Sequence, residues 1–234
     1  MAIGLDNSAA GTFSGAGPFT LSFQCSGSQR LLVAVLAGMR TAESNWSWDS
    51  AAFNGAALTQ QAVNAQFGNN RNVRVAVWTL VNPAAGAAYQ LAASANVNLS
   101  ARLMLMCLTG VDQVTPVGAT GTHAAQTNAF SANLTTGIAD AWVVGGAGIR
   151  NGTLAWSPGT GVTELNDQGT GSDASNDITA FFGYRVGGAA GSYGFAATAS
   201  GTNHGVLAAV EIRPAATGGS NIPVLFSYFR QLSR

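Results

Sequence analysis

Short apolar runs recur along the chain and are separated by clusters of Gly, Asn, Ser and Pro. In the stretch NVRVAVW, Val73, Val75 and Val77 share one side of an extended chain, and the residues between them face the other. This alternation is typical of a β-strand. Runs of this character cover residues 19–25, 31–38, 56–63, 72–81, 89–99, 102–110, 129–134, 141–149, 161–165, 177–186, 192–199 and 205–213. Regular spacing of short strands with turn residues between them predicts a sandwich or barrel.

Two heptapeptides are almost the same: residues 89–95 read YQLAASA and residues 193–199 read YGFAATA. Further matches follow in the same order, namely Trp78 with Phe182, Leu80 with Tyr184, Leu103 with Leu207, Leu108 with Ile212, AGMR (37–40) with AGIR (147–150), and Trp46 with Trp156. Several matches in one order predict an internal duplication.

We therefore predict an all-β fold, a jelly-roll-like β-sandwich built from two repeated halves at about residues 15–113 and 128–213. Two tandem immunoglobulin-like sandwiches are the alternative. The runs LLVAVL and LMLMCL are apolar on both faces, which favours a larger sandwich or an oligomer, because a small sandwich would expose one face. Residues 1–14 are expected to form an N-terminal arm, and residues 111–128 to cross between the halves.

Residues 214–234 are predicted to be a docking tail that follows a Gly-Gly spacer. Its apolar side chains fall at helical spacing and are Leu225, Phe226, Tyr228, Phe229 and Leu232. Because such a stripe is a liability in water, we expect it to bind a partner protein.

The composition is poor in charge: charged residues make up 9% of the chain, apolar residues 47%, and the formal net charge is zero. The usual charged share is about 25%, so we expect partner chains to cover part of the surface, in a homo-oligomer or a larger assembly. Met104 and Met106 are candidates for such an interface, because their flexible side chains adapt to a partner. The balance of charge argues against nucleic acid and against a polybasic membrane contact.

Every basic residue is Arg, which excludes a P-loop lysine and a Schiff-base lysine. The first fifteen residues lack the basic and apolar regions of a secretory signal, so synthesis in a cytoplasm without general export is expected. No apolar run approaches the roughly 20 residues that span a bilayer.

Catalytic patterns are not found in the sequence. It contains no G-x-S-x-G elbow and no converging pair of carboxylates, so we predict neither an enzyme nor a cofactor. His123 and His204 are expected in polar loops, without the short ligand spacing of a zinc site. Cys25 and Cys107 lie in apolar runs and are predicted to be buried free thiols.

Two candidate binding sites remain. An acidic, glycine-rich stretch could hold Ca²⁺ through oxygen ligands, although its spacing is not that of an EF-hand; its carboxylates are Glu164, Asp167, Asp173 and Asp177. Trp46 and Trp48 would share one strand face and could stack on sugar rings, or they could pack in the core.

Several stretches together resemble a family of bacterial and phage β-sandwich proteins. They are AIGLDNSAAGT at the start, RLLVAVL, FNGAALTQ, LVNPAAG, SARLMLMCLTGVDQVTPVG with its GVDQ-x-x-P motif, and AAVEIRP near the end. The resemblance covers most of residues 1–214. The chain departs from the family pattern at Val81 and Asn82, which follow Leu80 without a preceding tyrosine.

The resemblance implies a function in assembly. Phage-encoded members without signal peptides are expected to be virion components, such as capsid or tail decoration proteins or fibre proteins, that work by binding other virion proteins. The expected location is then the virion. The alternative is a carbohydrate- or receptor-binding module of a fibre tip or bacterial surface protein, which would bind a host glycan through Trp46, Trp48 or residues near His123.

Overall fold

The computed structural model describes residues 1–42, 45–68, 70–169 and 177–216, and within these ranges every regular element is a strand. The strands are β1 (Gly4–Gly15), β2 (Phe19–Gln24), β3 (Leu31–Arg40), β4 (Trp48–Phe53), β5 (Ala56–Ala57), β6 (Thr59–Gly68), β7 (Arg71–Val81), β8 (Ala88–Ala95), β9 (Leu99–Thr109), β10 (Val117–Thr136), β11 (Trp142–Arg150), β12 (Trp156–Pro158), β13 (Val162–Gln168), β14 (Ile178–Val186) and β15 (Gly191–Ile212). The prediction of an all-β sandwich is confirmed.

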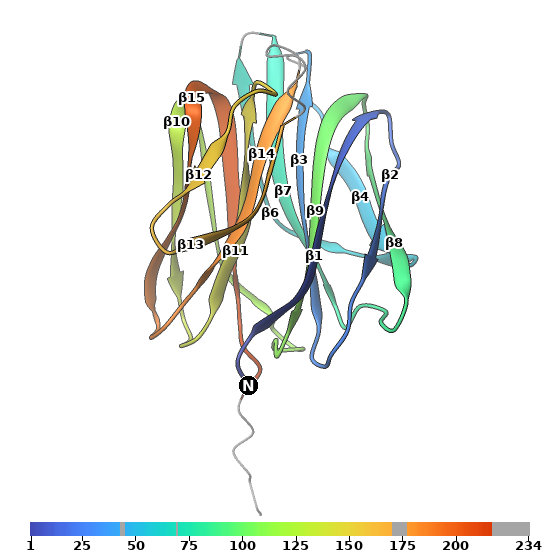
Figure 1. Ribbon diagram of the computed structural model, residues 1–234, viewed down its shortest axis with the longest axis vertical. Helices are drawn as coiled ribbons and strands as arrows, with labels where there is room; N and C mark the ends of the chain where they lie inside the picture. The colour runs from blue at the N-terminus through green and yellow to red at the C-terminus, as the bar shows by residue number, and fades with distance from the viewer. Residues whose placement is uncertain (43–44, 69, 170–176, 217–234) are drawn as a thin grey trace, which may run out of the picture.

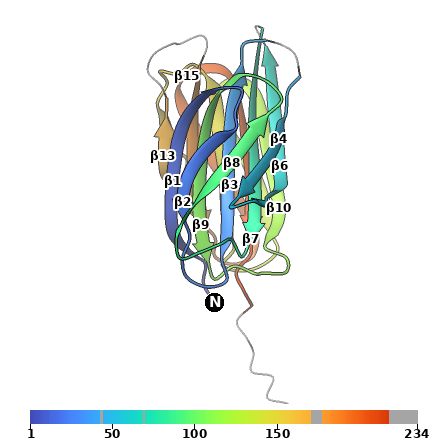
Figure 2. The ribbon, with the colours of Figure 1, turned by 90° about the vertical axis from the view of Figure 1, so that its right-hand side faces the viewer.

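Three antiparallel sheets form the molecule (Figure 1). A five-stranded sheet has the order β1-β9-β3-β7-β6, and a four-stranded sheet has the order β2-β8-β4-β5. The third sheet has the order β10-β15-β11-β14-β13, with β12 paired to β15. In the view of Figure 2, the four-stranded sheet lies in front of the five-stranded one.

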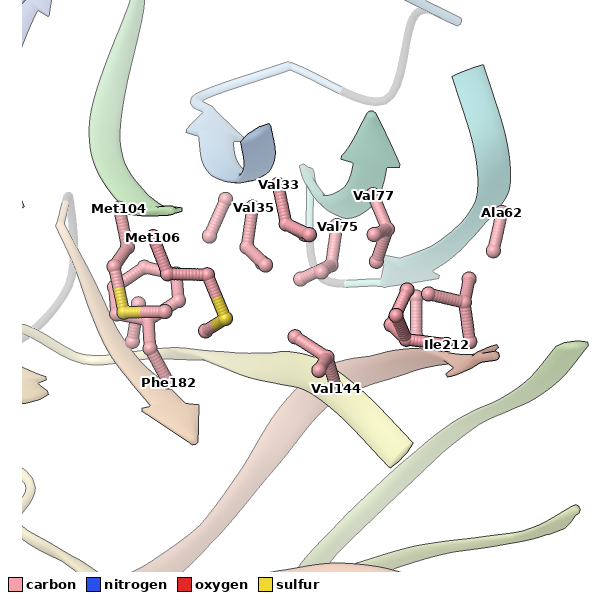
Figure 3. Packing of buried hydrophobic residues seen from close by; sticks show 14 of the residues in the cluster. Val33, Val35, Ala62, Val75, Val77, Met104, Met106, Val144, Phe182 and Ile212 are labelled. Atoms are coloured by element: carbon pink, nitrogen blue, oxygen red, sulfur yellow. The ribbon is translucent and has the colours of Figure 1, made fainter. Parts of the chain in front are cut away.

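The five-stranded sheet is covered on both faces. Alternate residues of β3, such as Leu32 and Leu36, face the four-stranded sheet and pack with Phe53 and Leu91. The residues between them face the third sheet across a second core (Figure 3), which contains Val33, Val35, Val75, Val77, Met104 and Met106 from one side and Val144, Phe182 and Ile212 from the other. The doubly apolar runs are therefore covered by other sheets of the same chain.

A third core lies on the far face of the third sheet. The long strands β10 and β15 have a register shift between Thr127 and Ala129, beyond which the same strands continue as an outer layer. Phe130 and Phe195 of this layer pack with Phe181 of β14. Each half of the chain thus makes its own two layers, and the halves join through their inner sheets.

The two halves have corresponding strand orders. The order β1-β9-β3-β7-β6 corresponds to β10-β15-β11-β14-β13, and Leu108 and Ile212, which the sequence comparison pairs, both face the core between the halves. The match of Trp78 with Phe182 is wrong by one position, because Trp78 faces the outer core and Phe182 the inner one. A shift of one residue along a strand turns a side chain to the other face. Duplication as the origin of the halves stays a prediction.

Several predicted boundaries are corrected. Residues 1–14 are not an arm, because β1 pairs with β9 along its length and forms one edge of the five-stranded sheet. Most of the crossing segment 111–128 belongs to β10. Met104 and Met106 are not on an outer face, since they are 1% and 0% exposed in the core between the halves.

The two ends of the described chain meet at one end of the sandwich (Figure 1). The Met1 ammonium donates a hydrogen bond to the carbonyl of Ala215 at 2.9 Å. An isolated bridge joins Val111 to Pro214 beside it. The docking tail is predicted over residues 214–234, and residues 217–234, with all five of its apolar side chains, lie outside the described residues.

Candidate protein-interaction surface

Exposed apolar side chains gather at the end of the sandwich where the two described chain ends meet. Seven large apolar side chains are exposed among the described residues, and five of them lie at this end. We call these five the terminal face: Met1, Val81, Val114, Ile138 and Val186. Their exposed fractions run from 37% for Val81 to 88% for Val114. The other two, Val63 and Phe67, lie on β6.

Strand register places the terminal face. Val81 ends β7 opposite Leu31, and Val186 ends β14 opposite Trp142. The ends of the two sheets are joined by a hydrogen bond from the Asp112 amide to the Arg213 carbonyl at 3.0 Å. Ile138 follows β10, whose last residues pair with the start of β15. The five side chains therefore come from both halves of the chain.

The GVDQ-x-x-P motif forms the turn that carries Val114. The Asp112 carboxylate accepts hydrogen bonds from the amides of Val114 at 2.8 Å and Thr115 at 3.1 Å. These two bonds lower the pKa of Asp112 below its ordinary value. The side-chain nitrogen Nε2 of Gln113 donates to the Val111 carbonyl at 2.9 Å and to the Arg30 carbonyl at 3.3 Å. The motif thus holds the crossing between the halves and presents Val114 to solvent.

The three candidate calcium ligands that the structure describes, Glu164, Asp167 and Asp177, do not form one metal-binding group. Asp177 is bound instead by Arg102, whose Nη2 lies 2.8 Å from its Oδ1, and it also accepts a hydrogen bond from the hydroxyl of Ser100. The Asp167 carboxylate accepts a hydrogen bond from the Trp156 amide at 2.8 Å. Asp173 lies outside the described residues.

Burial affects the other acids of this group. It raises the pKa of Asp167, against the opposing effect of the Trp156 amide. Burial also raises the pKa of Glu164, with a smaller contribution from the charge of Asp167. Within the part of the chain that the structure describes, no three His, Cys, Asp or Glu side chains form a group that could hold a metal ion.

The indoles of Trp46 and Trp48 are not available to sugars. They are 1% and 4% exposed and pack edge to face, with ring centroids 5.5 Å apart. Trp48 also packs against Phe19, and the guanidinium of Arg74 lies over the Trp46 ring. The stacking hypothesis is therefore corrected: both indoles belong to the core between the five-stranded and four-stranded sheets.

Both histidines lie in strands and not in loops. His123 is in β10, where its Nδ1 accepts a hydrogen bond from the Ser131 amide at 3.2 Å and its ring packs near Phe130. His204 is in β15 and only 9% exposed, with its ring close to the backbone of Gly68. The alternating small and polar residues around them gave no apolar signal, and only the long pairing of β10 with β15 makes them strands.

A small open cavity of about 220 Å³ lies where β1 and β13 approach each other. Its lining residues are Ser8, Ala9, Ala10, Met104, Leu165 and Asn166. Pockets for small ligands usually enclose about 300–1,000 Å³. The cavity is too small and too open to be a strong candidate for a substrate site.

Comparison with models of known families found no match, and neither the curated proteins nor the solved structures gave a significant one. The described residues contain no helix that is long and apolar enough to cross a bilayer. Among the described residues, the terminal face is therefore the candidate interaction surface.

Proposed function

We propose that this chain is a structural subunit of a virion, which binds capsid or tail proteins through the terminal face and through the apolar residues 225–232. The protein would work by static attachment, as a stiff block with one adhesive end. The observation that carries the proposal is the gathering of exposed apolar side chains at the end where the described chain finishes.

The terminal face offers apolar area to a partner. Fully covering an exposed valine or methionine side chain contributes about 1.5–3 kcal/mol, so covering all five partly exposed side chains contributes on the order of 5 kcal/mol before ordering costs. Apolar side chains are costly to leave in water when they gather on one surface. Ordinary solvation explains a single exposed valine, but it gives no reason for five at one end.

The described chain finishes at this end. The Ala215 carbonyl accepts a hydrogen bond from the Met1 ammonium, beside the terminal face. In the sequence, Leu225, Phe226, Phe229 and Leu232 follow the last described residue, 216, and we propose that they bind the same neighbouring subunit.

The identity of the partner rests on the resemblance to phage β-sandwich proteins and on the shortage of charge. Only 9% of the residues in the chain are charged, and such a composition suits a protein whose surface is partly covered by neighbours in an assembly. The three cores support a mechanical role, because layers packed on both faces resist deformation.

Quantitative mass spectrometry of purified virions tests the location. We expect the chain among the particle proteins, at high copy number if it coats the capsid or tail and at a few copies if it belongs to a fibre. Finding it only in the infected-cell lysate, and not in purified particles, would overturn the proposal.

Binding of the full chain to particles that lack it tests the surface. We expect the double variant Val114→Ser/Val186→Ser to bind at least about tenfold more weakly, which corresponds to about 1.4 kcal/mol. The matched control is Phe67→Ser, which removes an exposed apolar side chain of 44% exposure on β6, at the other end of its sheet. Equal loss of binding in both variants would refute the role of the terminal face.

A further inference from the structure

We propose that Cys25 and Cys107 form a disulfide that ties the four-stranded sheet to the five-stranded sheet when the protein folds under oxidising conditions. Cys25 directly follows β2 of the outer layer, and Cys107 belongs to β9 of the inner layer. Both side chains are free thiols with no exposed area, in the core between these two sheets.

The backbone around the two cysteines brings them together through β1. Asn7 of β1 is the cross-strand partner of Cys107. The Asn7 side chain also donates a hydrogen bond to the carbonyl of Gln24 at 3.1 Å, and the amide of Ser26 donates to the Asp6 carboxylate at 2.7 Å. The residues on both sides of Cys25 are thus bound to the two residues of β1 that lie next to Cys107.

Cys25 and Cys107 lie in the same buried cluster. The neighbouring Cys25 thiol, followed by burial, raises the pKa of the Cys107 thiol far above its ordinary value. Because the thiolate is the reactive form, the folded protein with reduced cysteines reacts slowly with oxidants. Formation of the bond is therefore expected during folding, before the core closes, and reduction of the finished bond is expected to be slow as well.

The second half of the chain has a polar link at the corresponding place. By strand pairing, Glu211 of β15 occupies the position of Cys107, and Thr136 at the end of β10 occupies that of Cys25. The Glu211 carboxylate accepts hydrogen bonds from the amides of Gly137 at 3.1 Å and Ala119 at 2.7 Å. This junction between layers is therefore held by side-chain bonds in the second half, and the cysteine pair takes that place in the first.

The reaction is a thiol–disulfide exchange with a small disulfide such as oxidised glutathione. One cysteine thiolate attacks the glutathione disulfide and releases a glutathione thiolate, which leaves a mixed disulfide on the protein. The second cysteine thiolate then attacks the mixed disulfide and releases the second glutathione. Two protein thiols lose two protons and two electrons, and the glutathione disulfide takes up both electrons.

The test is to unfold the full chain under reducing conditions and to refold it in oxidised glutathione or in a reducing buffer. In the oxidised sample we expect no titratable thiol after denaturation, an intact mass lower by about 2 Da, and a thermal midpoint higher by roughly 5–15 °C. The reduced sample keeps both thiols. Cys25→Ser and Cys107→Ser are expected to lose the difference between the two buffers.

Peptide mapping of the wild-type chain decides the connectivity without any variant. Cleavage after arginine releases Cys25 within residues 1–30 and Cys107 within residues 103–150, so the bond joins these two peptides until a reductant is added. The proposal is overturned if the protein refolded in oxidised glutathione keeps both thiols. It is equally overturned by glutathione adducts without the cross-link, or by a disulfide between two chains.

Discussion

Replacing Asp177 by alanine is expected to destabilise the fold by about 3–5 kcal/mol, because the change leaves the buried guanidinium of Arg102 without its counter-ion. Arg102 is on β9 in the first half of the chain and has no exposed area, and Asp177 directly precedes β14 in the second half. Their ion pair at 2.8 Å thus links the two inner sheets at the end opposite the terminal face.

The magnitude follows from the groups that lose a partner. Arg102 keeps hydrogen bonds to the Ala101 carbonyl at 2.9 Å and the Ser100 hydroxyl at 3.1 Å, but both acceptors are neutral. The amide of Ile178 loses the carboxylate that accepts its hydrogen bond at 2.8 Å. One charge-assisted bond is worth about 1.5–3 kcal/mol and an unsatisfied buried donor costs about 1–3 kcal/mol; their sum, about 2.5–6 kcal/mol, brackets the expected loss.

Urea denaturation followed by tryptophan fluorescence measures the effect, with Arg102→Met and the double variant completing a double-mutant cycle. We expect the double variant to be more stable than the sum of the two single changes predicts, by about 2 kcal/mol or more. The matched control is Arg213→Met, because Arg213 is partly exposed and 3.9 Å from Glu211. Its expected cost is about 1 kcal/mol or less.

The reasoning is refuted by a small single effect or by additivity. A loss below about 1 kcal/mol for Asp177→Ala would mean that water or another acid solvates the guanidinium. Purely additive single effects would mean that the two side chains stabilise the fold independently, and the ion pair would then not link the halves.

Three further changes probe other parts of the fold. Gly146→Ala is expected to cost about 1–3 kcal/mol in urea denaturation, since the added Cβ would lie 2.7 Å from the Phe181 carbonyl and 2.8 Å from Val35; an unchanged midpoint would show that the inner sheets can separate. Asp167→Asn is expected to flatten the dependence of the unfolding free energy on pH. Because the pKa of Asp167 is raised in the folded state, the wild type loses stability as the pH rises from about 4 through the folded pKa, and the variant does not; identical pH profiles of wild type and variant would contradict this. Asp112→Ala is expected to cost about 1 kcal/mol in urea denaturation, because the turn loses the carboxylate that accepts its two amide hydrogen bonds; the lowered pKa of Asp112 means that the stability of the wild type also falls as the pH drops below about 4, and a variant as stable as the wild type would contradict the assigned role.

The sequence by itself determined the strands with strong apolar patterns. Val73, Val75 and Val77 alternate because a strand turns successive side chains to opposite faces, so β7 could be placed to within one residue. The runs in β3 and β9 are apolar on both faces, and this predicted correctly that both faces are covered. Edge strand β1 was missed, because its small and polar residues bury little area and give no such signal.

Only the tertiary structure decided what covers each face and which side chains meet. Met104 is covered by a second sheet of the same chain. The sequence could not tell this from cover by a partner chain, because both arrangements bury apolar area equally well. It grouped Asp177 with neighbouring acids, whereas folding pairs it with Arg102, which is far away along the chain. Such contacts depend on the register and stacking of sheets, and local patterns carry no information about the distance between residues in different sheets.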